Sequence, residues 1–413
     1  MVTRNTILRK EIMFKMRVKI ERLDDFGRGI SFVNNKICFV SGVVPEEEVE
    51  IEITNEKRNY CDGKLIEIYN KSKNRCNGCK YNELCGGCSL DHINLEYENN
   101  YKLNKVNNII KKFSKIKYSV TDIYSLNALN YRNKIVLHGN KGKLGLYNSN
   151  SHNIVEIDEC LLVSNRINNI IKKLNKLDNK NVEEILIRVS NDEKKALIDI
   201  KGKVDYKKYL GLSDVLIVND EVISKNDSII TSIGDVKYYV SSKSFFQINL
   251  ELTMMLYDEI KKNVIKLKPK NILDLYCGTG SIGIYVCNGL DIDLVGIDNN
   301  SSNISDAFKN LELNNMSGNF ILGDVSKNIN LINDYDLVIV DPPRSGLDKK
   351  TINSLISSNV KNIIYVSCDP ITLVRDLDFL NYKYSVNSIK LFNMFPRTYH
   401  IECVGVLRRK KQS

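Results

Sequence analysis

The last third of the chain carries five short apolar runs, and helix-like segments separate them. The runs are NILDLYC, LVGID, FILGD, DLVIVDPP and NIIYVSCD, which begin at residues 271, 294, 320, 336 and 362. Apolar strands that alternate with helices are typical of a parallel sheet with helices on both faces. The pattern therefore predicts an α/β domain with a doubly wound sheet at this end of the chain.

A glycine-rich turn follows the first of these runs. Gly278, Gly280 and Gly283 fit the spacing G-x-G-x-x-G, and Asp298 ends the next run 20 positions after Gly278. Glycines at this spacing let the backbone turn tightly against a ligand, and the carboxylate can accept hydrogen bonds from both ribose hydroxyls. The pattern predicts a nucleotide cofactor, either a dinucleotide or S-adenosylmethionine. Asp324, which ends the third run, is a candidate for an adenine contact or a helix cap.

Two later runs end in unusual sequence, Asp341-Pro-Pro-Arg344 and Ser-Cys368-Asp-Pro. Ligand chemistry in open α/β sheets takes place beyond the carboxyl ends of the strands. Cys368 leaves an apolar strand at that edge and enters a loop before a helix. Because helix N-termini lower thiol pKa values and the thiolate is the reactive form, we expect Cys368 to be a nucleophile. A small core residue is the alternative.

The first 70 residues have a different texture. Short alternating runs with glycine turns between residues 15 and 70 predict a small antiparallel barrel. The basic residues there that are candidates for RNA contact, or that simply coat the surface, are Lys19, Arg22, Arg28 and Lys57. A formal net charge of +10 favours a polyanionic partner and a merely soluble surface about equally.

The location of the protein is expected to be cytoplasmic. No run approaches the ~18 apolar residues of a membrane span, and no apolar signal core stands at the start. We therefore expect no membrane partner.

Four cysteines lie close together in the pattern Cys76-x2-Cys79-x5-Cys85-x2-Cys88. Because a reducing compartment disfavours structural disulfides, metal binding is the better interpretation of clustered thiols. Read locally, the four thiols predict a compact zinc site.

Five motifs give the sequence a family resemblance. In chain order they are FFQIN from Phe245, DLYCGTGS from Asp274, DPPRSG from Asp341, YVSCDPITLVRDL from Tyr365 and FPRTYHIE from Phe395. The chain resembles the RNA uracil-5-methyltransferases over residues 15–408, in particular the branch with an N-terminal TRAM domain and an iron–sulfur cluster. The resemblance implies S-adenosylmethionine as methyl donor and RNA as partner. The expected target is a uridine in 23S ribosomal RNA, with transfer RNA as the alternative.

The resemblance also implies roles for single residues. Cys368 matches the nucleophile that adds to carbon 6 of uracil, and Glu402 matches the base that removes the proton from carbon 5. The positions that match the cofactor site are Gln247, Tyr276, Gly278, Gly280, Ser281, Asp298, Asp324 and Asp341. Phe245 matches too, although an aromatic residue there fits a core position equally well.

For the cysteines, the resemblance favours a [4Fe–4S] cluster. Its ligands would be Cys79, Cys85, Cys88 and Cys160, and Cys76 competes with Cys160 for the fourth place. The cysteines expected only to pack are Cys38, Cys61, Cys277, Cys287 and Cys403.

The expected architecture has three parts in a monomer. Residues 10–70 would form the OB-like TRAM barrel, 71–240 a central β-rich domain with the cluster, and 241–413 a Rossmann-like methyltransferase domain. The segment 92–122 is expected to pack on the catalytic domain.

Three rival functions remain in view. A methyltransferase for exocyclic amines would place an aromatic residue where Arg344 stands, and a radical enzyme with a TRAM domain would carry a C-x3-C-x2-C motif. The pair Cys368 and Glu402 argues against a non-catalytic iron–sulfur RNA-binding protein.

Overall fold

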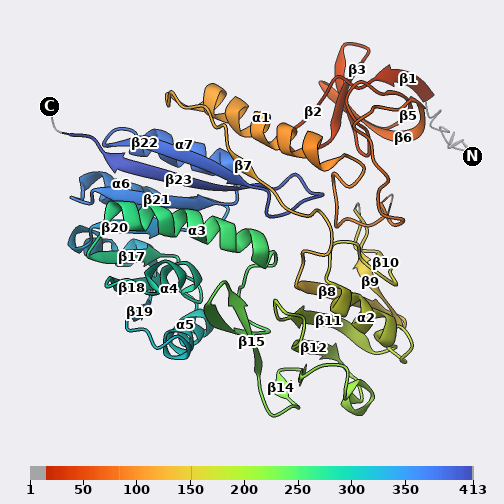
Figure 1. Ribbon diagram of the computed structural model, residues 1–413. Helices are drawn as coiled ribbons and strands as arrows, with labels where there is room; N and C mark the ends of the chain where they lie inside the picture. Colours follow the sequence, from red (N-terminus) through yellow and green to blue (C-terminus); the bar gives the residue numbers. More distant parts are fainter. Residues whose placement is uncertain (1–14, 83, 150, 412–413) are drawn as a thin grey trace, which may run out of the picture. The chain divides into compact units, whose positions relative to one another are not determined.

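The computed structural model describes residues 15–82, 84–149 and 151–411 (Figure 1). Residues 10–14 of the expected TRAM range lie outside this part. The described chain forms two compact units: the first holds 15–82, 88–98 and 397–399, and the second holds the remainder. No described helix is long and apolar enough to span a bilayer.

The first unit is built on a six-stranded sheet. Its strands are β1 (Lys15–Lys19), β2 (Arg22–Leu23), β3 (Gly29–Val33), β4 (Lys36–Val40), β5 (Glu48–Glu56) and β6 (Tyr60–Asn70). The order β1-β5-β6-β4-β3-β2 ends on two strands that follow each other in sequence, so the sheet curls until its edges come together. Asn34 and Asn35, both with positive φ, make the two-residue turn from β3 to β4. The predicted barrel is not purely antiparallel, because β4 and β6 run parallel.

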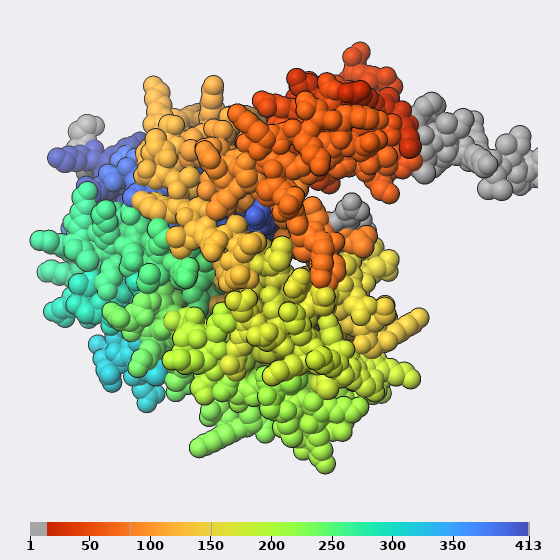
Figure 2. All heavy atoms as spheres, turned by 45° about the vertical axis from the view of Figure 1, so that its right-hand side comes forward, coloured from red at the N-terminus to blue at the C-terminus, as the bar shows by residue number. Residues whose placement is uncertain are grey.

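The second unit begins with a seven-stranded sheet of order β10-β9-β8-β11-β12-β13-β14. Its strands are β8 (Lys134–Asn140), β9 (Lys143–Tyr147), β10 (Ile154–Glu156), β11 (Val182–Val189), β12 (Ala196–Gly202), β13 (Val215–Val218) and β14 (Glu221–Val222). Ser164 caps helix α2 (Asn165–Leu174), whose residues Ile167, Ile170, Ile171 and Leu174 are buried at helical spacing. Helix α2 packs against β11, and these segments form a continuous yellow-to-green body in Figure 2.

A hairpin leads from this sheet toward the C-terminal part of the unit. Strands β15 (Ser228–Ile233) and β16 (Val236–Ser241) pair antiparallel, and α3 (Leu250–Leu267) begins after Asn249, whose side chain accepts a hydrogen bond from the Leu252 amide. The hairpin's Ile229, Ile233 and Tyr238 share one apolar core with α3.

An eight-stranded sheet of order β19-β18-β17-β20-β21-β23-β22-β7 completes the second unit. Its strands are β7 (Ile123–Tyr124), β17 (Asn271–Leu275), β18 (Asp293–Asp298), β19 (Asn319–Leu322), β20 (Leu337–Val340), β21 (Asn362–Ser367), β22 (Tyr384–Phe392) and β23 (Glu402–Arg409). The first five strands in the order run parallel, and β23 runs antiparallel to β21 and β22. The remaining helices after α3 are α4 (Ser281–Cys287), α5 (Ser301–Leu313), α6 (Lys349–Ser357) and α7 (Pro370–Leu380).

Helices cover both faces of this sheet, as the sequence predicted. Neighbouring residues of one strand enter different cores: Ile272 packs with side chains of α3, α4 and α5, and Leu273 packs with those of α6 and α7. A strand buried on both faces explains why the five runs are almost continuously apolar.

Helix α1 (Leu95–Phe113) belongs to the same architecture although it lies far away in sequence. Its Val106, Ile109 and Ile110 enter the core that contains Leu273. The short strand β7 that follows pairs with β22 at the sheet edge.

Candidate active site

The sequence-predicted residues meet at one edge of the eight-stranded sheet. Strands β17, β18, β20 and β21 are parallel neighbours, so their carboxyl ends, with Tyr276, Asp298, Asp341 and Cys368, lie at the same edge. Strand β23 runs the other way and starts at this edge with Glu402.

The strand register places Cys368 beside Glu402. Ser367 is the Cα partner of Cys403 in the antiparallel pair of β21 and β23. Because the strands are antiparallel, Cys368, which follows Ser367, faces Glu402, which precedes Cys403, and Glu402 is only 8% exposed. The sheet thus brings together two residues that are 34 positions apart in sequence.

The loop after β17 turns through left-handed backbone. Tyr276, Gly278 and Gly280 have φ values of +62°, +56° and +72°. At Gly280 a Cβ would stand 2.6 Å from the Phe320 ring, whereas at Gly278 it would meet no described atom within 4 Å. The backbone at Gly278 therefore borders open space, which fits close approach by a ligand.

Asp298 is fixed by this loop. Its Oδ2 accepts a hydrogen bond from the Gly278 amide at 3.0 Å, and its Oδ1 accepts from the Asn300 amide at 2.9 Å and from Asn303 Nδ2 at 3.2 Å. A carboxylate has about four acceptor positions. The fixed, half-buried carboxylate therefore keeps acceptor capacity for ribose hydroxyls, and the loop fits S-adenosylmethionine.

Asp324 does act as a helix cap. Its Oδ1 accepts the Ser326 amide at 2.8 Å at the start of the 3₁₀ turn η2 (Val325–Lys327), and the hydrogen bonds from Ser326 lower its pKa. The side chain is exposed, so capping and an adenine contact through the other oxygen are compatible.

The structure also describes three further predicted positions. The Gln247 carbonyl accepts a hydrogen bond from Asn133 Nδ2 at 3.1 Å. Ser281 Oγ lies 2.8 Å from the buried Tyr257 hydroxyl, which holds Ser281 at the start of α4. Phe245 is 67% exposed, so the alternative of a core residue was wrong.

The electrostatics of Cys368 differ from the sequence-based expectation. Burial, followed by the charges of Glu402 and Asp341, raises the pKa of its thiol to about 12, and only the charge of Arg344 acts in the lowering direction. The predicted lowering by the N-terminus of α7 was wrong. Asp369 caps that helix by accepting from the Ile371 and Thr372 amides, and its carboxylate adds a negative charge next to the thiol.

The carboxyl groups at this edge also hold their protons tightly. Burial raises the pKa of Asp341 to about 7, and burial together with the Asp341 charge raises that of Glu402 well above its ordinary value. Asp274, which is fully buried in β17, has a pKa of about 8 for the same reason, with the Asp341 charge adding to the burial effect. Such shifts are typical of catalytic sites.

Comparisons with known proteins agree with this geometry. A family model described as tRNA (Uracil-5-)-methyltransferase matches residues 213–411, and a TRAM domain model matches residues 10–66. An uncharacterized RNA methyltransferase of Caldanaerobacter subterraneus subsp. tengcongensis is 31% identical over 96% of this chain and 98% of its own length. The chain belongs to the RNA uracil-5-methyltransferase family. It is an RNA methyltransferase with a TRAM domain, and its methyl donor is S-adenosylmethionine.

Two more relatives span nearly the whole methyltransferase. A second uncharacterized RNA methyltransferase, from Fusobacterium nucleatum, is 31% identical and covers 96% of both chains. The tRNA (uracil-54, C5)-methyltransferase of Pyrococcus abyssi, solved with S-adenosyl-L-homocysteine, superposes with a TM-score of 0.80 at 26% identity. That match covers 95% of this chain and 100% of the other.

A clamp between the Arg344 loop and helix α7 of the methyltransferase was not predicted from the sequence. Arg375 Nη2 donates to the Ser345 carbonyl at 2.9 Å, and Asp376 Oδ2 accepts from the Leu347 amide and the Tyr365 hydroxyl, both at 2.7 Å. A Cβ at Gly346 would stand 2.5 Å from Arg375 Nη2. Arg375 and Asp376 of the motif VRDL therefore lock the Arg344 loop to the helix that follows Cys368.

The cysteine-rich segment gives no support to the iron–sulfur cluster. Within the described ranges, no group of three or more His, Cys, Asp and Glu side chains is placed to hold a metal ion. Cys79 and Cys88 belong to the first unit, and Cys85 and Cys160 to the second. Cys76 Sγ lies 3.1 Å from Arg397 Nη1 and 3.4 Å from the Asp91 carbonyl oxygen, inside the first unit.

Of the basic TRAM residues, Arg28 already forms an ion pair and a cation–π contact within the first unit. Its guanidinium pairs with Asp24 at 2.7 Å and lies 4.1 Å above the centre of the Phe39 ring. The other three, Lys19, Arg22 and Lys57, are exposed. Exposure fits both an RNA-binding surface and a surface that only faces solvent.

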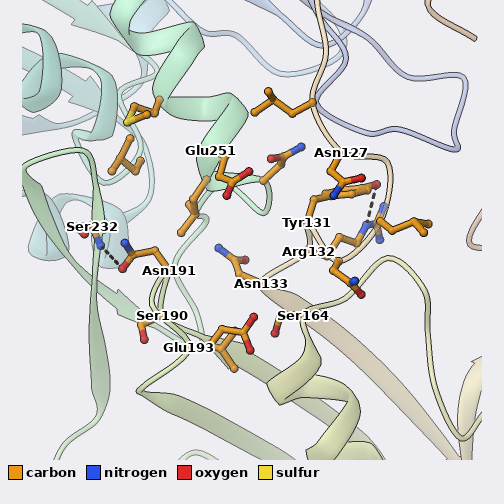
Figure 3. A pocket seen from close by; sticks show the side chains of 18 of the residues that line it. Asn127, Tyr131, Arg132, Asn133, Ser164, Ser190, Asn191, Glu193, Ser232 and Glu251 are labelled. Atoms are coloured by element: carbon orange, nitrogen blue, oxygen red, sulfur yellow. Dashed lines mark hydrogen bonds between the residues drawn. The ribbon is translucent and has the colours of Figure 1, made fainter. Parts of the chain in front are cut away.

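A cavity of about 420 Å³ lies elsewhere in the methyltransferase (Figure 3). Polar side chains dominate its lining, among them Asn127, Arg132, Asn191, Glu193 and Glu251. Neither Cys368 nor Glu402 lines it, but Asn133, which binds the Gln247 carbonyl, does.

Proposed function

We propose that the methyltransferase adds a methyl group to carbon 5 of a uridine in RNA through a covalent bond between Cys368 and carbon 6 of the base. The register of β21 and β23 supports this most directly, since it sets Cys368 beside Glu402. A nucleophile and a base at the cofactor edge are what an addition–elimination reaction on a pyrimidine needs.

The residues divide the chemistry into two steps. Carbon 5 of uracil is a poor nucleophile, and a bond from Cys368 Sγ to carbon 6 turns the ring into an enolate that can attack at carbon 5. S-adenosylmethionine supplies the electrophilic methyl group when it is bound. Glu402 then takes the proton from carbon 5, the electron pair re-forms the ring double bond, and the bond to Cys368 breaks.

The pKa shifts give each group a protonation state. With a pKa of about 12, the Cys368 thiol keeps its proton until attack begins, so a neighbouring group has to receive it. Asp341, with a pKa of about 7, is ionised in part at neutral pH and is the carboxylate we assign to this step. Burial and the Asp341 charge raise the pKa of Glu402, so Glu402 has to be in its ionised form when it takes the carbon-bound proton, and in that form it is a stronger base than an ordinary carboxylate.

Binding of the methyl donor is assigned to the loops around β17 and β18. Asp298 would accept from the ribose hydroxyls and Asp324 from the adenine amino group. The other assigned contacts are Gln247, Tyr276, Gly278, Gly280, Ser281 and Asp341.

The substrate is proposed to be 23S ribosomal RNA, and transfer RNA is the second candidate. The family resemblance favours the first, and the fold similarity to a tRNA (uracil-54, C5)-methyltransferase favours the second. In either RNA the target has to be unstacked so that both ring faces are exposed.

One assay separates the two substrates. Purified methyltransferase with labelled S-adenosylmethionine should be offered 23S ribosomal RNA and total transfer RNA from cells that lack its gene. We expect 5-methyluridine, identified by nucleoside mass spectrometry, in only one of them. Label in cytidine or adenosine would overturn the proposed chemistry.

We also propose the three-part division of the chain at residues 70 and 240.

The iron–sulfur cluster is a further proposal. Its ligands would be Cys79, Cys85, Cys88 and Cys160, which would hold about four irons in protein purified without oxygen. Zinc-loaded or metal-free protein would exclude the cluster. If iron is present, loss of it in Cys160→Ala but not in Cys76→Ala would identify the fourth ligand.

A further inference from the structure

Two basic residues face each other across the central sheet. Lys134 of β8 and Arg188 of β11 are direct Cα partners in an antiparallel pair, so their side chains lie on the same face. Strands β8 and β11 lie side by side in Figure 1. On this face Leu186 and Leu197 pack with the core of β15, β16 and α3, so it is not the face that α2 covers.

Arg188 is buried without a matching anion. It is 2% exposed, and its Nη2 donates to the Ser244 carbonyl at 3.4 Å. Nε and Nη1 are buried and have no hydrogen-bond partner in the described part of the chain. A buried cation with unsatisfied donors is costly, and burial accordingly lowers the pKa of Arg188 to about 10.

Lys134 adds a second charge to the same place. Like charges directly opposite each other destabilise a sheet. Burial and the Arg188 charge lower the pKa of Lys134 to about 8, and Glu184 opposes this only in part. Across the residues that the structure describes, neither Lys134 nor Arg188 forms an ion pair, whereas Lys201 on the same face pairs with Asp220 at 2.9 Å.

Lys134 is the accessible member of the pair, and both residues lie next to the segment Ser244–Gln247. Strand β9 pairs with β8 only over His138–Asn140. Lys134, at the other end of β8, is therefore not covered by β9 and is only half-buried. Ser244, which contacts Arg188, is followed by the exposed Phe245, and Asn133 binds the Gln247 carbonyl. An anion at Lys134 and Arg188 would therefore sit next to the loop that carries Gln247.

We propose that Lys134 and Arg188 form a binding site for a backbone phosphate of the RNA substrate close to the target nucleotide. This rests on the proposed methylation of RNA. A phosphate paired with the half-buried Lys134 would relieve the repulsion between the two cations, and the buried Arg188 would add the attraction of its charge. The carboxylate of S-adenosylmethionine is another anion that two cations could bind, and the test has to separate it from phosphate.

The test compares Lys134→Met with Lys201→Met, a matched control because Lys201 lies on the same face but is already paired with Asp220, which also pairs with Lys243. The probe is a fluorescent 20-nucleotide oligouridylate, and its affinity is measured at several salt concentrations. Each phosphate contact to a single strand contributes about 0.7 to the slope of log affinity against log salt. We expect Lys134→Met to lower the slope by about 0.7 and the affinity about fourfold at 0.15 M salt, and Lys201→Met to change neither.

Arg188→Met should also lower the salt slope and the affinity, provided that circular dichroism shows it to be folded. If it does not fold, Lys134→Met alone decides the test. Calorimetry with S-adenosylhomocysteine should give unchanged affinity in both. An unchanged salt slope in Lys134→Met would overturn the proposal. So would a loss of S-adenosylhomocysteine affinity as large as the loss of oligouridylate affinity. Failure of the underlying function is distinct, because it would appear as absent uridine methylation by the unaltered protein.

Discussion

Replacement of Gly346 by alanine should damage the clamp between the Arg344 loop and helix α7. Gly346 has φ of +74°, and a Cβ would lie 2.5 Å from Arg375 Nη2 and 2.6 Å from Asp376 Oδ2. Left-handed backbone costs a non-glycine residue about 1–2 kcal/mol. Loss of the buried hydrogen bonds of Asp376 adds about 1–3 kcal/mol. We therefore expect Gly346→Ala to lower the free energy of unfolding by about 2–5 kcal/mol.

Gly289 provides the matched control. Its φ of +77° is nearly the same, but an added Cβ would meet none of the described atoms within 4 Å. Gly289→Ala should therefore cost only about 1–2 kcal/mol. In a thermal melt each kcal/mol lowers the Tm of a domain of 150–250 residues by about 2–4 °C.

Both variants should be melted side by side and assayed for methyl transfer. Gly346→Ala should melt several degrees below Gly289→Ala and should lose more activity, because the Arg344 loop is no longer fixed to the helix after Cys368. Equal melting temperatures would refute the claim that the clamp fixes the Arg344 loop to helix α7.

Three further predictions concern the cofactor, the buried carboxyls and the thiol. Asp298→Ala should weaken S-adenosylmethionine binding by about 1.5–3 kcal/mol in calorimetry, as expected for a lost charge-assisted hydrogen bond; unchanged affinity, or tight NAD binding by the parent protein, would contradict the assigned site. Because the folded-state pKa of Asp274 is raised to about 8, its stabilising contribution is present at low pH and is lost as pH rises from about 4 to 8. Asp274→Asn should therefore flatten the fall of Tm over this range, and an unaltered pH profile would count against the shift. Alkylation of Cys368 by iodoacetamide, read by peptide mass, should accelerate about tenfold per pH unit between pH 8 and 11, whereas a plateau near pH 8 would mean a normal or activated thiol.

The sheet and its active edge could be predicted from the sequence because they depend on local regularities. Apolar runs that end in Asp298, Asp341 and Cys368 mark strand ends, and parallel neighbours bring those ends together. The turn at Asn34 and Asn35 was predictable for a similar reason, since two-residue hairpins favour Asn and Gly.

The charge state of the site could not be predicted in this way. The pKa of Cys368 depends on burial and on Glu402, which enters from a strand that is antiparallel and follows 34 positions later. The helix N-terminus that suggested an activated thiol is capped by Asp369. Local sequence shows the helix start, and only the fold shows that its amides are already occupied.

Side-chain environments escaped prediction for the same reason. The clamp of Arg375 and Asp376 lies inside a recognised motif, but its partner loop comes from the previous strand. Arg188, which is buried and has two guanidinium nitrogens without a partner in the described part of the chain, stands in an ordinary strand pattern, where a charge normally marks a solvent-facing position.

The central claim is that Cys368 forms the covalent bond and that Glu402 is needed only to resolve it. The measurement is a denaturing gel of labelled substrate RNA with the parent protein, Cys368→Ala and Glu402→Gln, and the attachment site is read by peptide mass. Glu402→Gln should accumulate a protein–RNA adduct that carries the transferred methyl group, and RNA with 5-fluorouridine at the target should trap the parent protein, because fluorine cannot leave as a cation. Cys368→Ala should form no adduct with either RNA. An adduct that survives in Cys368→Ala, or one that maps to Cys277 or Cys403, would contradict the account, as would normal turnover by Glu402→Gln.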